Sequence, residues 1–261
     1  MPELTEILTG FTYLFILVLF RFLGLFILTP ILSSESWPRR LKIALAFLLA
    51  VATTPMISAR YELQVPEHIL FMLGDIIREL GIGLIIGFMV QLVFAAFQLA
   101  GQFIDLKLGF MIANVFDPVS GVQVPLSGQF KNSLASLLFL AINGHIILID
   151  AVYSTFDTVP PGQLVVGERA WGIMFRHAGD MFITAFMIAL PIIGTVFMAD
   201  VIFGFLARSI PQMNIFIVGL PAKIFIGFLM FFLAVNLIFG YYLDVFAELF
   251  EHIEEMLRFF A

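Results

Sequence analysis

The sequence predicts an all-α, polytopic integral membrane protein built from helical hairpins. Hydrophobic residues make up 61% of the 261 positions and charged residues 12%, whereas soluble domains average about 45–50% and 25%. The mean hydropathy is +1.07. The apolar residues also gather into runs of about 20 or more, the length that a membrane-spanning helix needs.

Composition and motifs exclude several classes of function. The chain has no cysteine, which excludes disulfides, thiolate metal sites and cysteine nucleophiles. A net charge of −6 offers no basic surface for nucleic acid. A phosphate-binding glycine loop with lysine, HExxH and GxSxG are all missing, and the four histidines lack ligand spacing. We therefore expect no enzyme, no metal and no cofactor.

Six segments are apolar enough to span a bilayer, and we expect the first to be retained because MPELTEILTG lacks the basic start of a signal peptide. The third and fifth segments are too long for one simple crossing at about 1.5 Å per residue. The segments are Gly10–Leu32, Leu41–Ile57, Ile69–Ile104, Ser133–Tyr153, Gly172–Leu206 and Ile224–Tyr242.

The first two segments form a hairpin. Arg21 interrupts the first segment, and an isolated arginine at the bilayer centre costs roughly 2.5–3.5 kcal/mol. We therefore expect Arg21 to face protein, with a carboxylate or carbonyls as partner; the alternative is snorkelling to the interface. A turn, SSESWPRR, precedes the second segment. There Ala46 and Ala50 form a small-xxx-small pair suited to close helix contact.

The third segment carries charges near its start and glycines in its middle. Arg78 can pair with Asp75 at i,i+3, while Asp75 and Glu79 are i,i+4. We interpret these three residues as a small solvated ion-pair patch. Gly83-x-x-x-Gly87 favours close approach of another backbone.

The stretch Lys107–Pro125, KLGFMIANVFDPVSGVQVP, is mostly apolar but cannot form one continuous helix. Glycine and Asp-Pro interrupt it, because proline lacks an N–H and disfavours helix in the preceding residue. Irregular backbone at membrane depth survives only where protein buries it or where it lines a cavity. The stretch is either a loop packed on its own helices or a plug that closes a pore by excluding water. The plug candidates are Gly109, Phe110, Met111, Ile112, Val115, Phe116, Asp117 and Pro118.

The fourth and fifth segments each hold one unusual feature. His145 lies within the fourth, where a hydrogen-bonded core residue is the favoured interpretation. Pro191 should kink or divide the fifth segment. With Asp180 and Asp200, that kink keeps open an alternative function, a secondary transporter of a small solute.

We expect a long turn at Ala207–Lys223 before the sixth segment closes a hairpin. The following residues, Asp244–Ala261, form an amphipathic helix suited to an interface or a partner. The turn residues expected to make structural or partner contacts are Arg208, Pro211, Gln212, Asn214, Pro221 and Lys223.

Basic residues favour one orientation. With six crossings, the side of the first and third hairpin turns and of the central stretch holds seven basic residues against three on the other. The positive-inside rule then puts these turns and the plug candidate in the cytoplasm. The seven are Arg39, Arg40, Lys42, Lys107, Lys131, Arg208 and Lys223; the three are Arg60, Arg169 and Arg258.

Three stretches resemble the FliR family, the flagellar biosynthetic proteins of the type III export gate, and virulence-type relatives are similar. The first is Phe20-Arg21-x-x-Gly24 with the following turn and PRR. The second is Gly101 through Pro125, with GFMIANVFDP. The third is Ala207-Arg208-x-x-Pro211-Gln212-x-Asn214-x-Phe216 with Gly219-x-Pro221-x-Lys223.

The resemblance implies a subunit of a helical, pore-containing assembly in the bacterial inner membrane and flagellar basal body. It implies a FliP-like part over residues 1–130, ending in a plug loop at about 106–122. It also implies a C-terminal part over residues 131–261 that includes a FliQ-like hairpin at about 173–247. The implied partners are FliP-like, FliQ-like, FlhB-like and FlhA-like proteins, membrane lipid, and unfolded flagellar subunits as substrates. The implied role is non-catalytic: passing these subunits across the membrane while a hydrophobic loop seals the pore.

Overall fold

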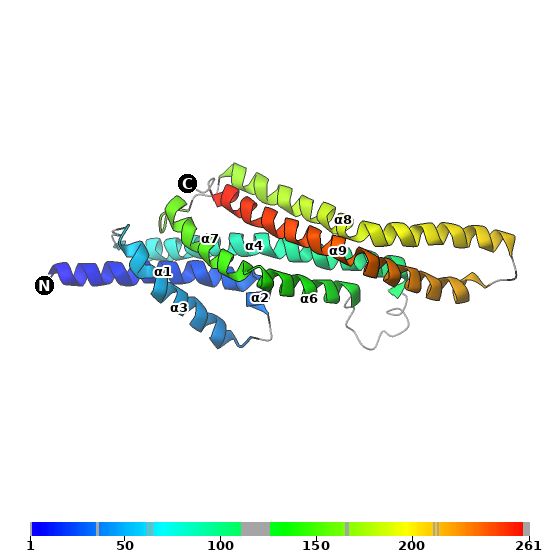
Figure 1. Ribbon diagram of the computed structural model, residues 1–261. Helices are drawn as coiled ribbons and strands as arrows, with labels where there is room; N and C mark the ends of the chain where they lie inside the picture. Colours follow the sequence, from blue (N-terminus) through cyan, green and yellow to red (C-terminus); the bar gives the residue numbers. More distant parts are fainter. Residues whose placement is uncertain are drawn as a thin grey trace. The chain divides into compact units, whose positions relative to one another are not determined.

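The structure, a computed structural model, describes residues 2–34, 37–61, 63, 65–110, 126–164, 167–210, 212 and 214–257. All regular structure in these ranges is α-helical (Figure 1), which confirms the predicted fold class. The helices are α1 (Pro2–Leu28), α2 (Pro30–Ser33), α3 (Arg39–Ser58), α4 (Ile69–Leu108), α6 (Leu126–Ala141), α7 (Gly144–Thr158), α8 (Glu168–Ser209) and α9 (Ile215–Leu257).

Length and apolarity make five of the described helices candidate membrane spans, and a sixth arises if α6 and α7 count as one broken span. The six segments expected from the sequence match them in order. Helices α4, α8 and α9 have 40, 42 and 43 residues, longer than the roughly 20 that a bilayer requires. The over-long third and fifth segments are therefore confirmed, and the sixth is longer than expected.

Contacts between Cα atoms group the chain into two compact units. The first comprises Met1–Leu92, Ile142–His177 and Glu248–Ala261. The second comprises Val93–Ala141 and Ala178–Ala247. Helices α4, α8 and α9 each contribute residues to both.

In the first unit, α1 and α4 run in the same direction and cross with their backbones in contact (Figure 1). A Cβ atom on Gly83 would lie 2.8 Å from the Leu25 nitrogen and 2.9 Å from the Gly24 Cα. A Cβ atom on Gly24 would meet Leu84 and Gly83 equally closely. Since real Cβ atoms do not approach this near, only glycine fits at either position. The predicted close approach at Gly83 is confirmed.

An aromatic cluster forms the core of the second unit. Phe97 of α4 stacks on Tyr242 of α9, with ring centroids 4.0 Å apart. Phe94 and Phe246 lie edge-on or tilted to their neighbours at 5.4–6.2 Å, and Phe139 brings α6 into the same cluster. These rings are buried, and such pairs contribute about 0.5–1.5 kcal/mol each beyond area burial.

The fourth predicted segment is wrong as a single helix. It breaks between α6 and α7 at Asn143, whose φ of 58° and ψ of 29° lie in the left-handed region. Asparagine tolerates that conformation better than most residues, and its carbonyl then accepts the first bonds of α7, from the nitrogens of Ile146 and Ile147. The Asn143-Gly144 pair is itself a turn signal in the sequence.

Pro191 and Pro221 both stand inside helices that continue past them. Pro191 does not divide α8, and the Thr195 hydroxyl donates to the Pro191 carbonyl at 2.8 Å. The predicted turn Ala207–Lys223 is shorter than expected, because α9 starts at Ile215 and encloses Pro221. Proline's fixed φ is compatible with a helix, and hydroxyl groups and neighbouring helices offset the lost bond in membrane proteins.

We predict that Gly83→Ala destabilises the protein, because its methyl group would force α1 and α4 apart. Overpacking of this kind costs about 1–3 kcal/mol. Gly74→Ala is the matched control on the same helix, since a Cβ atom there meets nothing within 4 Å, and alanine should be neutral or stabilising by up to about 1 kcal/mol. Thermal unfolding in detergent, followed by circular dichroism, compares the two; equal midpoints would contradict the close crossing.

Candidate functional site

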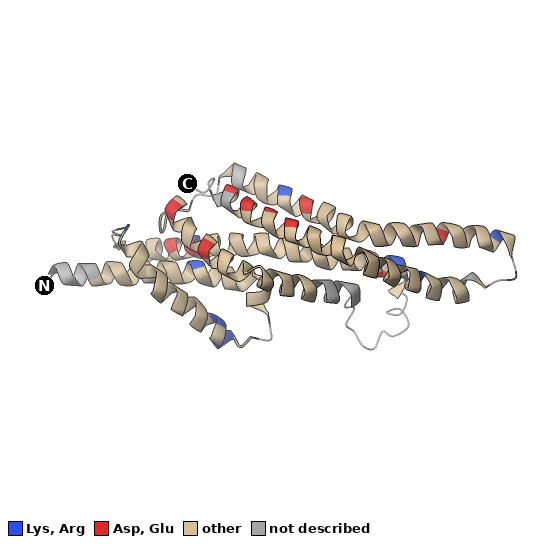
Figure 2. Ribbon diagram, viewed as in Figure 1, with Lys and Arg blue, Asp and Glu red and all other residues tan. Residues whose placement is uncertain are grey.

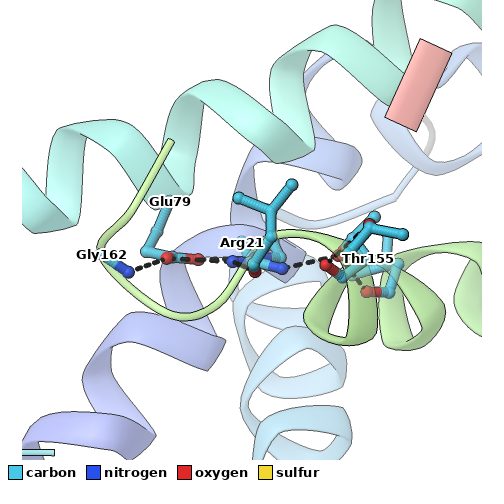
Figure 3. Close-up of polar contacts among 7 residues, drawn as sticks. Arg21, Glu79, Thr155 and Gly162 are labelled. Atoms are coloured by element: carbon cyan, nitrogen blue, oxygen red, sulfur yellow. Dashed lines mark hydrogen bonds and ion pairs between the residues drawn. The ribbon is translucent and has the colours of Figure 1, made fainter. Parts of the chain in front are cut away.

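Arg21 lies fully buried on α1 and pairs with Glu79 of α4 (Figure 3). Its Nε donates to Glu79 Oε2 at 2.5 Å, and its Nη2 donates to Oε1 at 3.0 Å. Both side chains have 0% exposure. The contact is a two-point ion pair, the strongest geometry available to arginine and a carboxylate. The carboxylate partner expected for Arg21 is present.

The remaining face of the guanidinium is held by α7 and the residue after it. Nη1 donates to the Thr155 hydroxyl at 2.7 Å, and Nη2 donates to the Val159 carbonyl at 3.2 Å. The guanidinium carbon also lies 3.7 Å from the centre of the Phe156 ring, a cation–π distance. Arg21 thereby joins α1, α4 and the end of α7 in the first unit.

A second layer of contacts ties the loop after α7 to α4. The Gly162 nitrogen donates to Glu79 Oε1 at 2.7 Å (Figure 3). The Gly162 carbonyl accepts from Arg78 Nη1 at 3.2 Å, and Gly162 has a φ of 79°, which favours glycine. Asp75 accepts from Arg78 at 2.8 Å and from the Tyr13 hydroxyl at 2.6 Å. Together with the contacts of Arg21, these bonds join eight residues of α1, α4, α7 and the loop after α7 in one polar network.

The structure corrects the interpretation of Glu79 as part of a solvated patch. The predicted Arg78–Asp75 pair exists, and Arg78 is 52% exposed in it. Glu79, one residue further along α4, turns inward to Arg21 instead. A buried carboxylate needs a cation and further donors, and Arg21 and the Gly162 nitrogen supply both.

The central stretch begins where α4 ends. Gly109 has a φ of 83°, the left-handed conformation that closes a helix, and its nitrogen donates to the Leu106 carbonyl at 3.3 Å. The Phe110 ring lies 6.2 Å from that of Phe228 on α9. Of the plug candidates, Met111, Ile112, Val115, Phe116, Asp117 and Pro118 lie outside the described residues.

The other candidate residues lie in the α8–α9 turn and in the adjoining ends of the two helices. Arg208 is exposed in the last turn of α8, and Gln212 and Asn214 are exposed between the helices. The Asn214 carbonyl accepts from the Ile217 nitrogen at 3.1 Å, the first bond of α9. Pro211 lies outside the described residues, and Pro221 belongs to α9.

Lys223 forms an ion pair with Asp200, which links α9 to α8 in the second unit. Both side chains are about one third exposed or less. Asp200 is therefore engaged in a structural contact. This ion pair accounts for one of the two acids on which the transporter alternative rested.

The α8–α9 hairpin leaves most of its apolar surface uncovered. Within the most apolar 18-residue stretch of each helix, only 28% is buried in α8 and only 17% in α9. Figure 2 shows long stretches of both helices without charge. Phe205 is 69% exposed and Phe232 is 74% exposed. Surfaces this apolar require lipid or other protein against them.

The described residues contain no group of three or more histidine, aspartate or glutamate side chains arranged to hold a metal ion. His177 and His252 do come together, with ring centroids 4.2 Å apart. The polar groups brought together here position helices, and they define the chain as a polytopic α-helical membrane protein with a structural ion-pair network.

Comparison with known proteins identifies the group within that class. Residues 12–249 match the family model for bacterial export proteins, family 1, and the chain belongs to this family. It is 34% identical over 246 residues to the flagellar biosynthetic protein FliR of Bacillus subtilis (strain 168), covering 93% of this chain and 94% of the relative.

Other relatives come from both flagellar and virulence settings. The chain is 32% identical over 239 residues to FliR of Escherichia coli (strain K12), covering 92% and 90% of the two chains. It is 26% identical over 224 residues to the surface presentation of antigens protein SpaR of Shigella flexneri, covering 85% of each. The resemblance drawn from three sequence stretches is confirmed across nearly the whole chain.

We predict that Arg21→Gln or Glu79→Gln destabilises the protein by about 3–5 kcal/mol, because either change leaves a buried charge without its partner. Replacing both residues by methionine should recover much of the loss, since the buried volume is then apolar. Unfolding in detergent, analysed as a double-mutant cycle, measures the coupling.

Arg78→Gln is the matched control on α4, because its exposed pair should contribute only about 0–1 kcal/mol. Equal effects of Arg21→Gln and Arg78→Gln would contradict the assignment of the buried pair as the main connection between α1 and α4.

Proposed function

We propose that this chain is a non-catalytic subunit of the export gate of a flagellar type III secretion apparatus. The observation that carries the proposal is the near full-length match to flagellar biosynthetic proteins at 34% and 32% identity. The match at 26% to a virulence-type protein is weaker, which favours the flagellar setting. The substrates would be unfolded flagellar subunits crossing the inner membrane.

The exposed hairpin supports a role inside a larger assembly. Helices α8 and α9 bury only 28% and 17% of their most apolar stretches. The rest of that surface is available to neighbouring subunits as well as to lipid. We assign that surface to FliP-like and FliQ-like membrane subunits, with FlhB-like and FlhA-like components nearby. Within the chain, residues 1–130 form the FliP-like part, and residues 131–261 contain the FliQ-like hairpin at about 173–247.

The central stretch, about 106–122, is the proposed seal of the pore. Its composition supports this role, because Phe110, Met111, Ile112, Val115 and Phe116 would exclude water from a narrow passage. Methionine adds a deformable filler that can repack around a passing chain. The end of α4 at a left-handed glycine is a defined point from which such a loop can leave the helix.

The proposed location is the bacterial inner membrane at the flagellar basal body. The side that holds the first and third hairpin turns and the central stretch has seven basic residues, and the other side has three. The positive-inside rule therefore favours a cytoplasmic position for these turns and this stretch. On this placement, substrates approach the seal from the cytoplasm.

We predict that the tagged full-length chain, extracted in a mild detergent, co-purifies with two or more small membrane proteins, which mass determination identifies as FliP-like and FliQ-like. Replacing the exposed Phe205 and Phe232 with alanine should lower their yield, because the truncation removes contact area on the hairpin. Leu70→Ala with Phe71→Ala, at exposed positions of α4, is the matched control. A chain that purifies alone and homogeneous would contradict the proposal.

We predict that shortening Gly109–Val119 leaves co-purification intact but raises ion leakage across the membrane, because the apolar constriction is lost. Single-channel conductance or membrane-potential dyes measure the leak. The control keeps the apolar volume with Met111→Leu and Ile112→Leu, and its leak should match the unmodified protein. Unchanged conductance in the shortened variant would rule out the seal while leaving subunit membership intact.

A further inference from the structure

We propose that Gly227 of α9 is a positioning residue for the end of α4. It leaves the space in which Leu108 lies and so fixes the point from which the central stretch leaves the helix. We call the contact between Leu108 and Gly227 the α4–α9 joint, and Figure 1 shows the end of α4 beside α9. This inference rests on the proposed role of the central stretch as a seal, and it adds which residues hold the base of that seal in place.

Leu108 occupies the volume that a side chain at position 227 would fill. A Cβ atom on Gly227 would overlap Leu108 Cδ2, and it would lie 3.3 Å from Cγ and 3.4 Å from Cδ1. All three terminal carbons of the leucine therefore border that volume, and moving one methyl group does not clear it. Leu108 is 2% exposed, and Gly227 is buried. The α4–α9 joint is thus a leucine packed directly on bare helix backbone.

Other glycines of the hairpin have no such neighbour. At Gly194 and Gly204 of α8, and at Gly240 of α9, an added Cβ atom would meet nothing within 4 Å. These three positions have room for alanine, which is a better helix former than glycine. At Gly227, in contrast, alanine does not fit unless Leu108 moves.

Neighbouring residues hold the same turn of α4 against the hairpin. The Lys107 ammonium lies 5.5 Å from the centre of the Phe197 ring on α8, which is within cation–π range. The ring centroids of Phe110 and of Phe228 on α9 are 6.2 Å apart. Lys107, Leu108 and Phe110 therefore contact both helices of the hairpin.

The backbone changes direction at the same place. Gly109, between Leu108 and Phe110, has a φ of 83°, and a glycine in the left-handed conformation commonly ends a helix. The residue before it is held in the α4–α9 joint, and the ring of the residue after it packs on α9. Because both flanking side chains are held by α9, that helix sets the direction in which the chain leaves α4.

The contact itself is tested with a disulfide, because the chain has no cysteine of its own. A Cβ atom at position 227 would lie 3.3 Å from Leu108 Cγ, the place that a cysteine sulfur would take, which is close to disulfide geometry. Leu108→Cys with Gly227→Cys should form an intrachain bond when the full chain is oxidised in membranes, read as loss of maleimide labelling. Leu108→Cys with Gly240→Cys, about 20 Å further along α9, is the matched control and should stay reduced.

The positioning role is tested by ion leakage, measured as for the shortened central stretch. Gly227→Ala should raise the leak about tenfold, because overpacking by one methyl group costs enough to displace the joint in a correspondingly larger share of molecules. Gly240→Ala is the matched control and should leave the leak unchanged. In the Leu108→Cys, Gly227→Cys pair, oxidation should lower the leak relative to the reduced state, since the bond restores the fixed position.

The outcomes distinguish the joint from the seal. A leak in the shortened variant without one in Gly227→Ala would overturn the positioning role and leave the proposed function intact. No leak in either variant would remove the seal, and the role of Gly227 with it. Failure of the Leu108→Cys, Gly227→Cys pair to close would overturn the joint. Where Gly227→Ala does not assemble, the cysteine pair decides, and equal leaks in its oxidised and reduced states would overturn the proposal.

Discussion

The first unit is organised around Arg21, a fully buried arginine whose charge has to be paired within the protein. Arg21 lies three residues before Gly24 on α1, and Glu79 lies four residues before Gly83 on α4. Because these helices run in the same direction and touch at the two glycines, both side chains emerge one turn before the crossing point. The close approach at the two glycines therefore sets the geometry of the ion pair.

The pair also determines the path of the chain far along the sequence. Val159 and Gly162, in the loop between α7 and α8, satisfy the donors of Arg21 and the acceptors of Glu79. Burial of two charges is unfavourable unless further hydrogen bonds complete them, and here a loop about 140 residues after Arg21 in sequence supplies these bonds. The loop's position is consequently a requirement of the ion pair.

The sequence was enough to predict the helices and the need of Arg21 for a partner, because the cost of a lone charge in lipid is large. It was not enough to select the partner. Asp75 and Glu79 have the same charge and differ by one helical turn, and their spacing to Arg78 suggested one shared patch. Only the crossing at Gly83 distinguishes the carboxylate that turns inward from the one that stays at the surface.

The same limit explains the errors at Asn143 and Pro221. Helix boundaries depend on whether backbone groups find partners, which tertiary contacts decide. Asn143 breaks an apolar run because its left-handed conformation lets its carbonyl start a new helix. Pro221 stands inside α9 without ending it, although proline removes a backbone hydrogen bond there. The residue type favoured the opposite outcome at Pro221, whereas at Asn143 the Asn-Gly pair agreed with the break and the apolar run around it obscured the signal.

The distribution of polar contacts decides how this chain can associate with others. Two ion pairs, Arg21 with Glu79 and Lys223 with Asp200, form within the chain. The exposed faces of α8 and α9, in contrast, are mostly apolar. In a bilayer, apolar faces gain little from leaving lipid, so helix association there relies on close packing and shape. Under the proposed function, neighbouring subunits would therefore be recognised by the shape of the long α8–α9 hairpin. That division suits a subunit whose interior must stay fixed while its surface is shared with other polypeptides.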